Sequence, residues 1–454
     1  MTQVSMRKRI WGWWAFDWAS QPYHTLLITF IFGPFFAEVA TNTFIGQGLS
    51  ESAAKAQAQS TWSLCLTLAG LTIGICAPFL GALADISGRR KPWVFLFSLM
   101  YVCGAAGLWF MDPGGSNLHL MLLVFGLGFL GAEFALICVN GQLPSLGERE
   151  NVGTLSGFGF AIGYLGGVCA LILMLTLFVE QSTGRTIIGL EPIFGLDPAA
   201  REGTRAVGPI TALWFAVFII PYFLWVQEAQ QPKARATLRD AVGSVVRAVK
   251  NLRYRLSLSC YLGSSMLYRD ALNGLYTFGG IYAALVLDWP ITLIGIFGII
   301  SAISAAFFCW AGGLADRRFG PKPVIRVSIL VLVLVCILVV SMSREQIFGL
   351  PLPAGSTLPD YLFFLCGVLI GGFGGILQAS SRSLMVRHTT ADTATEAFGL
   401  YGLSGRATAF LAPALIGLAT TLSGSARLGI TPVIFLFLAG LLILRWVNSE
   451  GDQV

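Results

Sequence analysis

Polar and charged residues interrupt an otherwise apolar segment near the start of the chain, "AFDWASQPYHTLLITF" (15–30). Asp17, Gln21, His24 and Thr25 recur at i, i+4, i+7 and i+8, which places them on one face of an α-helix. A charge near the centre of a bilayer costs about 2.5–3.5 kcal/mol even on insertion scales. Pro22 adds a further demand, because it leaves the carbonyl of the residue four before it without its helical partner. This face is therefore expected to lie against protein or a water-filled cavity.

Further ionisable residues lie deep inside apolar segments, and they define a predicted substrate site. Arg269 and Arg406 lie roughly 18 Å and 15 Å into their segments at 1.5 Å per residue. A guanidinium binds a carboxylate through two parallel hydrogen bonds, so Arg406 suits a substrate with a carboxylate group. The predicted substrate and proton site in a central cavity consists of Asp17, Gln21, Glu133, Asn140, Tyr268, Arg269, Asp270, Gln378, Tyr401 and Arg406.

Each of these residues also has a structural alternative. Asp17, Glu133 and Arg406 would serve equally as members of ion pairs that brace the helices, and the two tyrosines as packing residues. Arg269 and Asp270 are adjacent, hence about 100° apart on a helix, and are expected to face different partners. Proton coupling is a hypothesis that rests on Asp17, Glu133 and Asp270.

Composition identifies the class of protein that must position these residues. Of 454 residues, 55% are hydrophobic and 11% are charged, whereas soluble domains have about 25% charged residues. Apolar segments of about 20 residues or more cross a hydrocarbon core of about 30 Å. The sequence predicts an all-α membrane protein with twelve such helices, at 11–37, 60–84, 93–111, 119–141, 153–179, 208–226, 257–286, 290–315, 324–342, 360–385, 396–421 and 430–447.

Charge in the connecting loops predicts the orientation. Lys and Arg concentrate at 7–9, 89–91, 233–255 and 317–326, and they are sparse in the other loops, which places both termini in the cytoplasm. The net charge of +6 reflects this asymmetry and does not indicate nucleic-acid binding. The basic start precedes a long apolar run without a cleavage site, so we expect a retained helix and no signal peptide.

Other chemistries find no support in the sequence. All nine cysteines fall inside predicted helices and the three histidines are scattered, so neither a metal nor another cofactor is expected. The phosphate-binding pattern GxxxxGK[ST] does not occur, which argues against ATP hydrolysis. The sequence also shows no nucleophile–base pair of the kind that would predict an enzyme.

An internal repeat divides the chain. "GALADISGRRKP" (81–92) returns as "GGLADRRFGPKP" (312–323), each time after the second helix of its half. We predict six-helix bundles at 1–226 and 257–454, joined by a cytoplasmic linker at 227–256. The linker is polar and basic, compatible with an amphipathic helix on the inner membrane surface that acts as a tether or a regulatory docking site. Two such halves are typical of the major facilitator architecture, in which substrate binds between the halves near the midplane.

The repeat also predicts a cytoplasmic gate. Gly81 allows close helix packing, and Asp85 ends its helix where it can cap and charge-pair with a neighbouring helix terminus. Gly88 turns the short loop, and the following basic residues bind carboxylates or anionic lipid head groups. The second copy is degenerate, with one extra residue before its glycine. The predicted gate consists of Gly81, Asp85, Gly88, Arg89, Arg90, Asp316 and Arg382; the alternative is ordinary helix packing.

Several stretches resemble one branch of the major facilitator superfamily, the vacuole-effluxer-like family, which is named for an autophagy-related fungal amino-acid exporter and has many bacterial members. They are "WAFDWASQPYHTLLITFIFGPFF" (14–36), "NGQLPSLGERENVGTLSGFGFAIGYLGG" (140–167), "LYRDALNG" (267–274), "QASSRSL" (378–384) and "EAFGLYGLSGRATAFLAP" (396–413). Ser20, Gln21 and Pro22 depart from the family's Asn-Ser-Ala, and Arg406 replaces its lysine. The resemblance implies transport of small metabolites, with export of neutral amino acids the best-known activity.

These observations together predict a secondary active transporter. It would move a small amphoteric, amino-acid-like metabolite by alternating access, with proton coupling as a hypothesis. We expect a monomer in contact with lipids in a bacterial inner membrane. The alternatives are an exporter of lipids or amphipathic drugs, and a receptor or scaffold that keeps the fold without transporting.

Overall fold

The computed structural model describes residues 4–452, except 182, 229–236, 290, 354 and 424. Helices account for nearly all of it. Eleven helical stretches of the described residues, some made of consecutive helices, are long and apolar enough to cross a membrane. The predicted seventh segment forms one further continuous helix, α11 (Leu256–Val286). The predicted all-α class is confirmed, and helical residues lie in each of the twelve predicted segments.

The first half of the chain begins with α1 (Met6–Pro22), a π-helix (Tyr23–Phe30) and α2 (Phe32–Gly46). It continues with α3 (Glu51–Ile86), α4 (Lys91–Gly107), α5 (Leu118–Asn140), α6 (Val152–Leu177), α7 (Glu202–Arg205), α8 (Val207–Phe218) and α9 (Ile220–Trp225). One short 3-10 helix follows α4, and others lie in the loops before and after α6.

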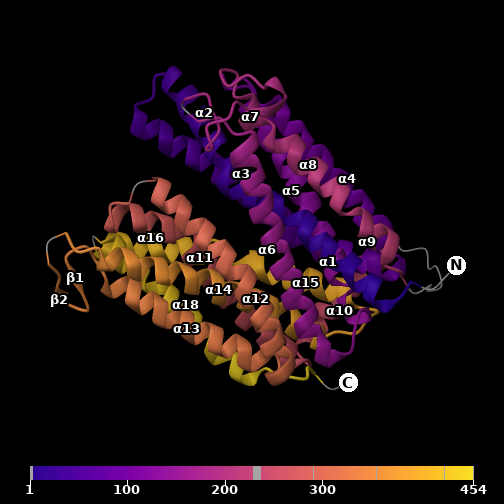
Figure 1. Ribbon diagram of the computed structural model, residues 1–454. Coiled ribbons are helices and arrows are strands. Elements are labelled where there is room, and N and C mark those ends of the chain that lie inside the picture. The colour runs from indigo at the N-terminus through magenta and orange to yellow at the C-terminus, as the bar shows by residue number, and fades with distance from the viewer. Residues whose placement is uncertain are drawn as a thin grey trace. The chain divides into compact units, whose positions relative to one another are not determined.

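The second half contains α10 (Leu238–Leu252), α11, α12 (Ile291–Phe319), α13 (Pro321–Ser341), α14 (Leu358–Arg387), α15 (Ala394–Ala407), α16 (Leu411–Ser423), α17 (Ala426–Gly429) and α18 (Thr431–Ile443). A two-stranded hairpin, β1 (Gln346–Ile347) with β2 (Leu350–Pro351), joins α13 to α14. The predicted eleventh segment is thus two helices, because the chain leaves helical geometry at Thr408–Phe410. Figure 1 shows α13 running beside α14 and α18.

The first predicted helix changes its winding at Pro22. The Trp18 carbonyl, which proline deprives of its helical donor, accepts a hydrogen bond from the Trp214 indole nitrogen at 3.2 Å. The next residues form hydrogen bonds that span five residues, such as Ile31 N–H to the Leu26 oxygen at 2.9 Å. The expectation that this carbonyl faces protein is confirmed. The α-helical repeat, however, does not continue to His24 and Thr25, since they lie in the π-helix.

The contacts divide the chain into two compact units. The first comprises 1–76, 87–139 and 162–234, and the second comprises 77–86, 140–161 and 235–454. The boundaries fall inside α3 and α6, so the ends of these helices pack with the second half of the sequence. Part of the predicted linker, 229–236, lies outside the described residues, and its remainder contains α10. The division into bundles at 226 and 257 remains a prediction.

Glycines allow the helices of each unit to approach closely. In the second unit, a Cβ at Gly157 of α6 would lie 2.6 Å from the Cα of Gly313 in α12, so neither helix has room for a side chain there. This contact explains one glycine of the glycine-rich run at the start of α6. In the same unit, a Cβ at Gly371 of α14 would collide with the Ser301 carbonyl oxygen of α12.

We expect Gly371→Ala to lower the midpoint of thermal unfolding of the purified protein, because overpacking costs about 1–3 kcal/mol. Gly295→Ala is the matched control, because nothing lies within 4 Å of a Cβ at that position of α12. Alanine at Gly295 should leave the midpoint unchanged or raise it, since Ala favours a helix over Gly by about 1 kcal/mol. Equal midpoints for the two variants would contradict this account of α12–α14 packing.

Candidate functional site

Asp85 caps a helix that is remote from it in the sequence. Its Oδ2 accepts a hydrogen bond from the backbone N–H of Glu396 at 2.9 Å, in the first turn of α15. Thr393, which precedes α15, makes no side-chain capping bond of its own. A carboxylate at this position both satisfies an unpaired donor and interacts favourably with the helix dipole. The expected contact of Asp85 with a neighbouring helix terminus is therefore present.

Two glycines bring the backbones of α3 and α15 together around this cap. A Cβ at Gly81 would lie 2.5 Å from the Thr395 carbonyl oxygen, and one at Gly399 would lie 2.6 Å from the Ala77 carbonyl oxygen. The glycine of the repeat is thus required by the close approach that allows Asp85 to reach α15.

Asp316, the aspartate of the second repeat, occupies an equivalent position against α6. Its side chain is 1% exposed, and Ser383 donates a hydrogen bond to its Oδ1 at 3.3 Å. The second residue of α6, Gly153, lies so close that a Cβ there would collide with the Asp316 carboxyl group. Both repeats therefore place a carboxylate at the first turn of another helix, despite the extra residue in the second copy.

Arg382 of α14 joins the end of α5 and the first turns of α6 to the second half of the chain. It is 3% exposed. Its guanidinium donates to Ser156 Oγ at 2.9 Å, to the Ser156 carbonyl at 2.8 Å and to Asn140 Oδ1 at 3.2 Å. The same group lies 4.3 Å from the centre of the Phe160 ring. The structure thus places Asn140, which we expected in the substrate site, beside the predicted gate residue Arg382.

The loop after α3 belongs to the first unit. Gly88 has a φ of +64°, a conformation that glycine adopts without strain. Arg89 is mostly exposed. The backbone N–H groups of Arg90 and Lys91 donate to Glu228 Oε1 at 2.7 and 2.8 Å, which caps α4 from beyond α9. Glu228 was not among the predicted site residues, because its one signal in the sequence is a negative charge within a basic linker.

Arg269 and Asp270 of α11 have different partners, as their spacing predicted. Arg269 donates to the Tyr401 carbonyl at 2.9 Å, and its guanidinium lies 4.1 Å from the centre of the Tyr401 ring. Asp270 is 1% exposed and accepts from the Ala412 N–H at 2.9 Å. Asp270 therefore caps α16 where the predicted eleventh helix breaks.

Three other expected site residues of the second unit differ in burial. Tyr268 is fully buried, and its hydroxyl lies 2.7 Å from Ser381 Oγ. Gln378 of α14 and Arg406 of α15 are half-buried.

In the first unit, the polar residues of the first helix lie against α5 and α6. Asp17 is 8% exposed and contacts Gly163, while Gly167 of α6 packs against Gln21 and Thr25. His24 Nε2 lies 3.7 Å from Glu133 Oε1 of α5. His24 was part of the predicted polar stripe but was not among the predicted site residues. It contacts one of them, Glu133.

Two further clusters of charged residues, outside the predicted gate and substrate site, connect segments that are distant in the sequence. Glu180 accepts from Thr204 Oγ1 at 2.6 Å and from the Thr204 N–H at 3.0 Å, and Arg201 bridges Glu180 at 3.1 Å and Glu38 of α2 at 3.1 Å. At the other end of the chain, Asp452 accepts from the N–H groups of Ser257 and Leu258, each at 3.1 Å, and so caps α11.

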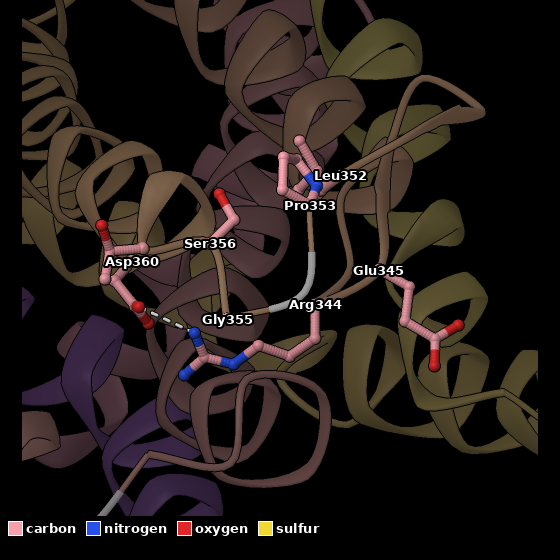
Figure 2. Close-up of a pocket in the computed structure, with 8 residues that line it drawn as sticks. Arg344, Glu345, Leu352, Pro353, Gly355, Ser356 and Asp360 are labelled. Atoms are coloured by element: carbon pink, nitrogen blue, oxygen red, sulfur yellow. Dashed lines mark hydrogen bonds and ion pairs between the residues drawn. The ribbon is translucent and has the colours of Figure 1, made fainter.

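A pocket of about 480 Å³ lies between the β1–β2 hairpin and the start of α14 (Figure 2). It is lined by Arg344, Glu345, Leu352, Pro353, Gly355, Ser356, Thr357 and Asp360. Arg344 pairs with Asp360 at 2.7 Å and donates to the Leu287 carbonyl at 2.7 Å. These contacts connect the segment before the hairpin to the end of α11 and the start of α14. Across the part of the chain that the structure describes, no three His, Cys, Asp or Glu side chains gather as a metal site would need.

Comparison with known proteins identifies the family of this chain. The family model for vacuole effluxer Atg22-like proteins matches residues 5–453. The chain belongs to this family. It is 25% identical over 442 residues to the MFS-type transporter YxiO of Bacillus subtilis, covering 97% of this chain and 94% of that one. Autophagy-related protein 22-1 of Neosartorya fischeri is 22% identical over 310 residues, or 64% of this chain and 46% of the fungal protein. The family resemblance seen in the sequence is thereby confirmed.

Solved structures show the same fold at low sequence identity. The proton:xylose symporter XylE matches with a TM-score of 0.71 and 10% identity, covering 98% of each chain. The human organic anion transporter MFSD10 matches with a TM-score of 0.70 and 16% identity, covering 97% of this chain and 100% of that one. This member of the family is therefore a multi-pass membrane protein with the major facilitator fold, and its relatives include transporters of that superfamily.

We expect Asp270→Leu to lower the thermal unfolding midpoint, because a buried N–H of α16 would lose its acceptor at a cost of about 1–3 kcal/mol. Asp270→Asn retains an acceptor oxygen and should preserve most of the stability. Thermal unfolding of the two purified variants decides this. A loss with asparagine as large as that with leucine would show that the charge of Asp270, rather than the cap on Ala412, is what the fold requires.

Proposed function

We propose that this protein is a secondary active transporter that moves a small, amphoteric, amino-acid-like metabolite by alternating access. The observation that carries the proposal is that both repeats place an aspartate against the first turn of another helix: Asp85 caps α15, and the Asp316 carboxyl group packs against Gly153 of α6. Membership of a family described as vacuole effluxers supports transport as the activity and export as its direction.

The strength of these contacts suits a gate that must open. A side-chain cap contributes about 0.5–2 kcal/mol, and a charge at a helix terminus about 0.3–1 kcal/mol. States that interconvert differ by only a few kcal/mol. The Asp85 cap, together with the hydrogen bonds of Arg382, would favour one state without preventing the other. We therefore assign these residues to the cytoplasmic gate.

For the substrate, we propose Arg406 as the group that binds a carboxylate. Arg406 is half-buried in the last turn of α15. Its planar guanidinium suits a carboxylate, which it would bind through two parallel hydrogen bonds. Arg269 of α11 donates to the Tyr401 carbonyl of the same helix. The carboxylates of Asp17 and Glu133 would complement the amino group of an amphoteric substrate, or bind the coupling proton. Asp270, whose Oδ2 accepts a hydrogen bond from the Ala412 N–H, is the third carboxylate that we propose for proton coupling.

We also propose that the protein is a monomer of a bacterial inner membrane with both termini in the cytoplasm. The experiment that tests the function is uptake of labelled amino acids and of labelled lipids into proteoliposomes, with and without an imposed pH gradient. Accumulation of an amino acid supports the proposal. Movement of lipid alone would favour the lipid-exporter alternative, and movement of no solute would favour a receptor or scaffold. Uptake that is indifferent to the pH gradient would exclude proton coupling.

We expect Asp85→Asn to reduce turnover several-fold more than substrate binding, because its proposed role is to stabilise a gate and not to contact substrate. Transport and equilibrium binding are measured on the same reconstituted preparation. Glu51→Gln is the control, since Glu51 is an exposed carboxylate paired with Lys55. Losses of equal size in binding and in transport would place Asp85 in the substrate site or in folding.

We expect Arg406→Gln to weaken binding of the substrate roughly 10- to 150-fold, because a hydrogen bond to a charged group contributes about 1.5–3 kcal/mol. Arg406→Lys keeps the charge and should lose less. The decisive comparison is between an amino acid and its carboxamide. The wild-type protein should prefer the acid, and Arg406→Gln should lose that preference. If the preference survives in Arg406→Gln, this residue is not in the substrate site.

A further inference from the structure

The helix of the linker, α10, begins at a defined residue. Thr237 and Asp240 form a reciprocal cap, in which the Asp240 N–H donates to Thr237 Oγ1 at 3.2 Å and the Thr237 N–H donates to Asp240 Oδ2 at 3.2 Å. The side-chain hydrogen bond from Thr237 lowers the pKa of Asp240 from its ordinary value. Asp240 therefore stays ionised at the helix N-terminus, where the dipole favours it.

The apolar face of α10 is only partly covered. Ala241 and Val245 are buried against Ala82 of α3, with Phe79 and Leu83 packed around them. Three further valines continue the apolar face and remain exposed: Val242 (41%), Val246 (44%) and Val249 (49%). At about 100° per residue they lie within roughly 60° of one another, side by side with the buried strip.

The position of α10 along α3 gives its depth in the membrane. No charged residue occurs in α3 between Lys55 and Asp85, and the continuous apolar run ends at Ala84. The α3 residues that α10 contacts lie within about 9 Å of Asp85 along the helix axis, at 1.5 Å per residue. The exposed valines thus lie beside the cytoplasmic end of the apolar run that we predict for α3, toward the head-group region of a bilayer.

Positive charge borders the exposed valines. Arg239 and Lys250 fall next to them on the helical projection, and both are exposed. Beyond the C-terminus of α10, Arg253 lies over the ring of Tyr254, which is itself exposed beside Leu256. A strip of apolar residues flanked by basic and aromatic ones is the composition of a helix that lies in the interface of an anionic bilayer.

The opposite side of α10 reaches the gate. Ser244 donates a hydrogen bond to Glu396 Oε2 at 2.8 Å, and the N–H of Glu396 is the group that Asp85 caps. We propose that α10 docks on anionic phospholipid head groups through Val242, Val246, Val249, Arg239 and Lys250, and that this docking stabilises the Asp85–α15 cap through Ser244. The docking is independent of the proposed function, whereas its effect on the gate rests on it.

Amide hydrogen exchange of α10 in nanodiscs tests the docking without any transport assay. The full chain is reconstituted in phosphatidylcholine alone or mixed with phosphatidylglycerol. We expect exchange in 238–252 to be several-fold slower with phosphatidylglycerol, and high salt to reduce this difference by screening. Glycerol 3-phosphate added to neutral nanodiscs should not reproduce the protection, because the valines require a lipid surface. Protection by the free phosphate ester would overturn the lipid assignment.

Matched variants complete the test. Arg239→Gln with Lys250→Gln should abolish the effect of phosphatidylglycerol, whereas Arg247→Gln, on the polar side of the same helix, should retain it. Equal exchange in the two lipids for the wild type, or equal loss with Arg247→Gln, would overturn the docking. Ser244→Ala should keep the lipid-dependent protection but lose any dependence of transport on phosphatidylglycerol. If Ser244→Ala retains that dependence, the link to the gate is wrong and the docking stands.

Discussion

The structure depends on carboxylates that cap helices remote from them in the sequence. Asp85 caps α15, Asp270 caps α16, Glu228 caps α4, Glu180 caps α7 and Asp452 caps α11. The residues that precede α4, α7, α11 and α15 make no side-chain capping bond of their own. The first backbone donors of a helix need acceptors. In this protein that need is met by tertiary contacts, so helix ends and tertiary structure are stabilised together.

This dependence bears on how a transporter could change state. Packing between apolar helices in lipid lacks a strong hydrophobic driving force, so close glycine contacts and polar bonds determine which helices associate. Gly81 and Gly399 allow α3 and α15 to approach, and the Asp85 carboxylate completes the contact with a hydrogen bond from the Glu396 N–H. Contacts of this kind are specific in geometry but modest in free energy. A gate built from them would be well defined when closed and still able to separate.

Sequence patterns predicted the helices well and their irregularities poorly. Long apolar segments define membrane helices because the bilayer sets their length, and the repeat indicated that Asp85 would meet a helix terminus. Proline signalled a change at residue 22 but not the π-helix after it, because that winding depends on tertiary contacts. The break at Thr408–Phe410 follows no proline, and one of its ends is capped by Asp270, well over a hundred residues away. Glu228 and Asp452 were missed for the same reason, since no local period reveals a distant partner.

The π-helix also sets the rotation of α2 relative to α1. Its hydrogen bonds span five residues where those of an α-helix span four, so each residue advances by less than the α-helical 100°. If the same eight residues wound as an ordinary α-helix, α2 would therefore turn about its axis. Glu38 would then turn away from Arg201, which also bridges Glu180. The unusual winding of this short segment thus determines which face of α2 meets the loop before α7.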